Sequence, residues 1–192
     1  MPSDFSEVCE KLGIRESVWT IDLAHLVHQY GIKHKMYTVT LGANPAYEDL
    51  TYYNQEIKAE FGEEQDRVDR QFASAASKGV QVEKRSIPIE EIVDNLQRNS
   101  PAIILVDDAI LRCDWCEENR KERGCSINCF KSGEEESYIG HFIVLCGVDV
   151  DKKTFLYRNP GISESLCCCS FDNLDKARRS LGTDEDILFI YR

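Results

Sequence analysis

Two residues of this 192-residue sequence, His141 and Asn159, have the types and spacing of a proton-transfer pair. His141 begins one apolar stretch, 141–148, and Asn159 directly follows another, 154–158. If the two stretches form a hairpin with its turn near residues 150–151, residues whose numbers sum to about 300–302 lie opposite each other. His141 and Asn159 sum to 300, so they should be cross-strand neighbours. An amide beside an imidazole orients it, as in a nucleophilic triad. The competing interpretation is that both are ordinary strand-end residues.

Four cysteines fall in a charged segment, about residues 107–139, which we expect to be an insertion in the domain. A Cys-x2-Cys pair and a Cys-x3-Cys pair are separated there by eight residues, and the four are Cys113, Cys116, Cys125 and Cys129. Four thiolates can hold zinc tetrahedrally, and the metal would order a segment that has little apolar surface to bury. The set is therefore a candidate structural zinc site, and the alternative is four reduced thiols in a loop.

Other residues of chemically active types have simpler interpretations. Cys9 is flanked by carboxylates, which raise a thiol pKa, so we expect it in a connecting helix and not as a nucleophile. The adjacent cysteines at 167–169 would alternate between the two faces of a strand and give a mixture of buried and exposed thiols. His25 and His28 share a helix face without a third ligand and are predicted to be surface or groove residues. The acidic run 184–186 is predicted to be a solvated turn.

Hydrophobic periodicity predicts the elements that would position these groups. Helices are expected at 17–31 with Thr20 as N-cap, at 63–78, from Pro88 onward and near 171–181. Strands are expected at 33–41, 80–84, 102–106, 141–148, 154–158 and 187–191, of which 102–106 is apolar throughout and should be covered on both faces. Helices followed by mostly hairpin-connected strands predict an α+β fold, with helices packed on a mostly antiparallel sheet.

Length and charge narrow the class of protein. The 192 residues suit one domain spanning 1–192, with a genuine core. A formal charge of −11 repels nucleic-acid backbones and anionic membranes alike, and no apolar run approaches the roughly 18 residues that span a bilayer. The acidic N-terminus is not a signal peptide, so we expect reduced cysteines and a location in the cytoplasm or nucleus.

Four ordered blocks resemble the guanylyl cyclase domain-containing protein family of eukaryotes. They are Ser-Val-Trp-Thr-Ile-Asp-Leu-Ala at 17–24, Gly-His-Phe-Ile-Val-Leu at 140–145, Asn-Pro at 159–160 and Gly-Thr-Asp-Glu-Asp-Ile-Leu at 182–188. That family is similar to bacterial double-glycine leader peptidases, which have a papain-like fold with Asp-Cys-Gly, Gly-His and Asp-Pro blocks. The resemblance implies a papain-like cysteine-peptidase fold here. It maps the catalytic histidine and the third triad member onto His141 and Asn159.

The sequence departs from that pattern at its start, where the block Asp-Cys-Gly-Leu-Ala-Cys is missing. We therefore expect a papain-like domain without its N-terminal nucleophile helix, inactive as a peptidase in this chain and able to bind a peptide or protein partner. Two alternatives stay open. One is a guanylate cyclase that converts GTP to cyclic GMP, as the family name suggests, although the sequence has no Gly-rich phosphate loop and no basic cluster. The other is a non-catalytic protein-interaction module.

Overall fold

The computed structural model describes residues 4–14, 17–44, 57–114, 138–161 and 166–191. Their helices are α1 (Phe5–Leu12), α2 (Thr20–Gln29), α3 (Ile57–Ala75), the short 3-10 helix η2 (Ala76–Lys78), α4 (Ile89–Gln97) and α6 (Phe171–Arg178). Their strands are β1 (Lys33–Thr38), β2 (Val82–Lys84), β3 (Ala102–Asp107), β4 (Gly140–Asp149), β5 (Thr154–Arg158), β6 (Leu166–Ser170) and β7 (Ile187–Tyr191).

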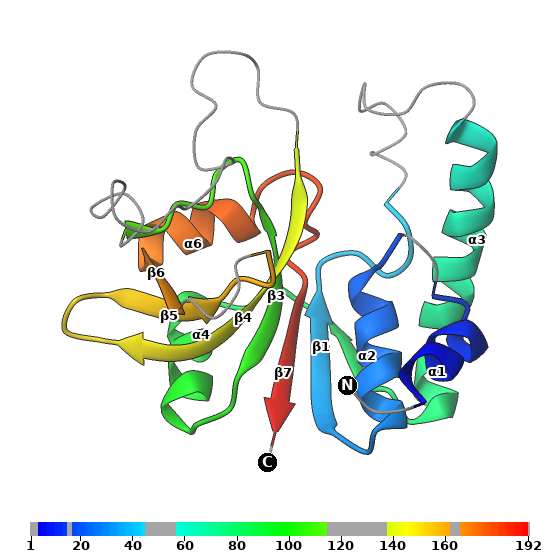
Figure 1. Cartoon of the computed structure of the whole chain (residues 1–192), viewed down its shortest axis with the longest axis horizontal. Helices are drawn as coiled ribbons and strands as arrows, with labels where there is room; N and C mark the ends of the chain where they lie inside the picture. Colours follow the sequence, from blue (N-terminus) through cyan, green and yellow to red (C-terminus); the bar gives the residue numbers. More distant parts are fainter. Residues whose placement is uncertain (1–3, 15–16, 45–56, 115–137, 162–165, 192) are drawn as a thin grey trace.

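One seven-stranded sheet runs through the molecule in the order β2-β1-β7-β3-β4-β5-β6. All neighbouring strands are antiparallel except β1 and β2, which are parallel. The last strand, β7, lies in the interior of the sheet and joins the β1–β2 part to the four strands β3–β6 (Figure 1). The predicted α+β class with a mostly antiparallel sheet is therefore confirmed, whereas the papain-like identity of the fold stays a prediction.

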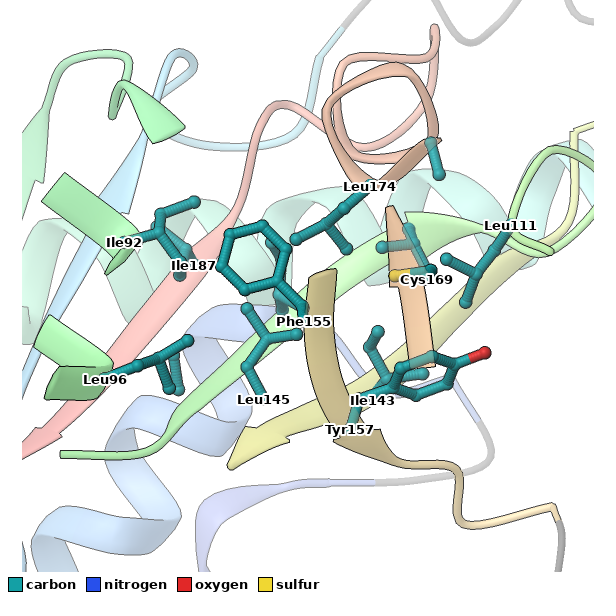
Figure 2. Packing of buried hydrophobic residues seen from close by; sticks show 14 of the residues in the cluster. Ile92, Leu96, Leu111, Ile143, Leu145, Phe155, Tyr157, Cys169, Leu174 and Ile187 are labelled. Carbon is teal, nitrogen blue, oxygen red and sulfur yellow. The ribbon is translucent and has the colours of Figure 1, made fainter. Parts of the chain in front are cut away.

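Helices cover the two faces of the sheet separately, and side-chain alternation along β7 shows the division. Ile187 and Phe189 belong to a core that includes residues of α4 and α6, whereas Leu188 belongs to a second core with residues of α2 and α3. In the first core, the ring of Phe155 lies between Leu145 of β4 and Leu174 of α6 (Figure 2). Two independent packing layers thus hold the sheet in place.

Several local expectations need correction. Helix α2 begins at Thr20, and its N-cap is Trp19, whose backbone N–H donates to the Asp22 carboxylate at 2.9 Å. The central strand β3 is fully buried on one face only, since Leu105 is half-exposed. The cysteines at 167–169 are all buried, because β6 is covered on both faces, so the expected mixture of buried and exposed thiols is wrong. Within the described residues, no helix is long and apolar enough to cross a membrane.

Candidate functional site

His141 and Asn159 meet where β4 begins and β5 ends, on two neighbouring interior strands of the sheet. His141 is the second residue of β4, Asn159 directly follows β5, and the His141 Nε2 atom lies 2.9 Å from Asn159 Oδ1. The predicted contact is therefore confirmed. The strands pair with Val144 opposite Arg158, and a bulge between Leu145 and Gly147 shifts the register nearer the turn. The contact is accordingly diagonal, within the reach that long side chains have across a strand pair.

A neighbouring hydrogen bond shows which atom of the His141–Asn159 pair is the donor. Asn159 Oδ1 also accepts the backbone N–H of Gly161 at 2.8 Å, so this atom acts as a carbonyl acceptor. His141 Nε2 must then be the donor, which leaves Nδ1 of a neutral ring as an acceptor. Both side chains are half-buried, so the imidazole is held in place and still in contact with solvent. Such a ring can accept a proton from a thiol or hydroxyl that approaches Nδ1.

The chain that leads into β4 is fixed by Asp107, the last residue of β3 and the pairing partner of Gly140. The Asp107 carboxylate accepts the backbone N–H groups of Ala109 and Ile139 at 3.1 and 3.2 Å, and the hydroxyl of Ser180 at 2.8 Å. Asp107 is buried, and these three donors satisfy the hydrogen-bonding capacity of its carboxylate. These bonds position the backbone that immediately precedes His141.

The partner described for the His141 imidazole is the side-chain amide of Asn159. The described cysteines are Cys9, Cys113, Cys146 and the three at 167–169. Cys146 lies five residues farther along β4, about 17 Å away, and partial burial raises its thiol pKa, which disfavours the reactive thiolate. Cys9 lies in α1, as predicted, on the part of the molecule beside α2 and α3 (Figure 1). Cys9 and Cys146 thus lie away from the His141–Asn159 pair.

The predicted zinc ligands are only partly placed. Cys113 is buried in the core with α4 and α6, whereas Cys116, Cys125 and Cys129 lie outside the described residues. Among the residues that are described, no three His, Cys, Asp or Glu side chains gather as a group that could hold a metal ion. The zinc site stays a prediction.

A second polar feature, which we call the Asp186 pocket, lies at the N-terminus of α2. It is lined by Trp19, Thr20, Ile21, Thr38, Thr40, Gly42, Phe72, Asp184 and Asp186. Asp186 is only 7% exposed, and burial together with the nearby charge of Asp184 raises its pKa to about 7. Asp184 and Glu185 both have positive φ, of 48° and 52°. The predicted turn is present at Asp184 and Glu185, which are partly exposed, but Asp186 is buried, so the expectation that the whole run 184–186 is solvated is wrong.

The histidine pair on α2 also needs correction. His25 is buried, and its Nε2 atom lies 3.2 Å from the backbone oxygen of Gln71 in α3. Desolvation lowers the pKa of His25, so the neutral ring is favoured there. This side chain joins two helices and is not a surface residue, whereas His28 is half-exposed.

Comparisons with known proteins show the family of this chain. Residues 1–190 match a family model described as guanylylate cyclase. The chain is 36% identical over 188 residues to Guanylyl cyclase 1 of Arabidopsis thaliana, an alignment that covers 97% of this chain. The chain spans 63% of the length of that relative.

Proposed function

Since this chain belongs to the guanylylate cyclase family, we propose that His141, oriented by Asn159, is the proton-accepting group of its functional site. The observation that carries the proposal is the 2.9 Å hydrogen bond between the two side chains, with Asn159 Oδ1 held in turn by Gly161. An oriented imidazole with one free nitrogen is the general-base half of a papain-like site. Its natural reactant is a thiol or hydroxyl presented to Nδ1.

For the chain itself, the proposal is a papain-like site that binds a polypeptide without cleaving it. Peptide-bond cleavage by such a site needs a thiolate, whereas the partner described for His141 is the Asn159 amide. The described thiols with resolved pKa shifts, Cys146 and Cys169, both have a raised pKa because they are desolvated. An imidazole without its nucleophile retains little covalent chemistry.

The tautomer of His141 tests this arrangement. In ¹⁵N-labelled protein at a pH where the ring is neutral, long-range ¹H–¹⁵N spectra should show the proton on Nε2. Replacing Asn159→Ala should remove this preference and give a mixture of tautomers, whereas Asn159→Asp, which keeps an acceptor, should preserve it. A proton on Nδ1 in the unaltered protein would refute the proposal.

A second candidate function is guanylate cyclase activity, favoured by the 36% identity to Guanylyl cyclase 1. In this reaction His141 would accept the proton of the ribose 3′-hydroxyl, whose oxygen attacks the α-phosphorus of GTP and expels pyrophosphate. Incubation with GTP and Mn²⁺ or Mg²⁺, followed by mass-spectrometric measurement of cyclic GMP, should give product that falls about 10²- to 10⁴-fold in His141→Ala. Equal yields from the two proteins would exclude His141 from cyclisation.

A further inference from the structure

Three of the four histidines in this sequence lie together where α2 leads into β1 (Figure 1). His25 and His28 are one helical turn apart on α2, and His34 is the second residue of β1. The rings of His28 and His34 meet edge to face, with 5.9 Å between their centroids. His28 also lies against the end of η2, since a Cβ atom on Gly79 would be 3.1 Å from its ring. One corner of the fold thus gathers side chains of the type whose charge changes near neutral pH.

The ring of His34 has no acceptor for a second proton. Its Nδ1 atom lies 2.8 Å from the backbone oxygen of Ile32, and a carbonyl oxygen only accepts, so Nδ1 carries the proton of the neutral ring. The other nitrogen, Nε2, is buried and has no hydrogen-bond partner among the described residues. Protonation would therefore bury a charged N–H group without an acceptor. Accordingly, desolvation lowers the pKa of His34.

His25 joins α2 to α3 while its ring is neutral. Its side chain is 2% exposed, and Nε2 donates to the backbone oxygen of Gln71. The second proton would have to enter on Nδ1, inside the protein. Desolvation lowers the pKa of His25, and this effect outweighs the hydrogen bond to Gln71, which acts in the opposite direction.

The charged groups around these two buried rings oppose a second proton further. Lys78, at the end of η2, repels charge on the ring in α2, and His28 repels charge on both rings. The carboxylate on this side, Asp22, is already bound by Arg67 of α3. On β7, the residue paired with the ring in β1 is the apolar Ile190. Protonation would thus concentrate positive charge at this corner.

We propose that His25 and His34 form a proton-sensitive latch, with His28 beside both, that holds α2 and β1 against α3 and η2 when its rings are neutral and loosens this corner when they are protonated. Loosening follows because a charged ring must reach solvent, which separates the elements that bury it. The latch lies on the α2–α3 face of the sheet, where Met36 follows it in β1, whereas the His141 site lies on the α4–α6 face.

The sign of the effect follows from proton linkage. The unfolded chain takes up protons on these two histidines near pH 6.5, whereas the folded chain resists them until the pH is lower. Their contribution to stability is therefore complete above about pH 6.5 and is lost as the pH falls below it. Asp186 acts with the opposite sign, because its pKa, raised to about 7, lets the folded chain take up a proton first. Histidine variants separate the two contributions, since both proteins compared keep Asp186.

Ring titration in the unaltered full chain tests the latch first. Long-range ¹H–¹⁵N spectra of ¹⁵N-labelled protein should show the rings of His25 and His34 still mostly neutral at about pH 6.5, where a free imidazole is half protonated. His34 should carry its proton on Nδ1, and His25 should carry its proton on Nε2. Half-protonation of both rings at or above this pH in the folded protein would overturn the proposal.

A double variant then measures the effect on stability. His25→Gln keeps a donor for the Gln71 oxygen, and His34→Phe keeps a flat ring, so the pair removes both titrations with little change in shape. The unfolding constant of the unaltered protein, divided by that of the double variant, should rise at least about 10-fold between about pH 7.5 and pH 5.5 in urea unfolding. The same pH dependence in both proteins would contradict the latch.

Two further measurements locate the change. Lys78→Gln should weaken the acid effect, whereas Lys176→Gln, an equal change of charge on an exposed part of α6, should leave it unaltered. Amide hydrogen exchange, corrected for its intrinsic pH dependence, should accelerate at about pH 5.5 in α2 and β1 more than in α6. Equal acceleration in all three elements, or equal effects of the two lysine variants, would show that no local latch exists.

Discussion

Asp22→Ala is expected to lower the free energy of unfolding by about 3–5 kcal/mol, one of the largest effects of any single substitution in this chain. The Asp22 carboxylate is completely buried and is bound by both terminal nitrogens of Arg67, at 2.5 and 2.8 Å. It also accepts from the Gln71 side chain at 2.8 Å and from the Trp19 backbone at 2.9 Å. The substitution would strand these donors, and the Arg67 charge would be left with Glu64 as its acidic partner.

Urea unfolding followed by circular dichroism measures this loss, and an exposed ion pair provides the control. Glu83 contacts Lys35 and Arg85 at the surface, so Glu83→Gln should have a much smaller effect because solvent screens such pairs. If the free energy of unfolding of Asp22→Ala differed from that of the original protein by less than about 1 kcal/mol, the buried ion pair would be dispensable for stability.

Phe155→Ala is expected to destabilise the protein to a similar degree, about 3–5 kcal/mol, through loss of burial and the cavity that remains. Phe155 is fully buried on β5 (Figure 2). Its ring packs 4.4 Å, centroid to centroid, from that of Phe171. The same strand leads directly to Asn159, so the effect should extend to the His141–Asn159 hydrogen bond.

Thermal unfolding together with the His141 spectrum distinguishes the global effect from the local one. Phe171→Ala removes the neighbouring ring, which is only partly buried, and should cost clearly less stability than Phe155→Ala. Equal losses of stability from the two substitutions would mean that the deeper burial of Phe155 adds nothing to the stability of this core.

The sequence is sufficient to predict contacts that depend on short chain separation. His141 and Asn159 are joined by a short turn, so counting residues across it places them together. The pairing of Asp22 with Arg67 spans 45 residues and joins two helices, and no local pattern encodes it. The parallel pairing of β1 with β2 is similarly a result of tertiary packing.

Burial was the property that the sequence predicted least well. His25 and Asp186 are polar and stand in helical or turn patterns that are usually solvated, yet both are buried. For Asp186 one signal was present, since it directly precedes the apolar strand 187–191 and forms a backbone hydrogen bond to Leu105 of the neighbouring strand. The cysteines at 167–169 are buried on both faces of β6, which alternation alone does not predict.

The interior position of β7 has a consequence for how the chain is made. During synthesis, β1 and β2 leave the ribosome early and β3–β6 later, but these groups of strands have no ladder in common until residues 187–191 emerge between β1 and β3. Until then, one long edge of each group is unpaired, which is the kind of surface that nascent chains expose to aggregation. Completion of the sheet is thus a late, non-local event, and a chain that stops before residue 187 would carry two open-edged groups of strands that β7 does not join.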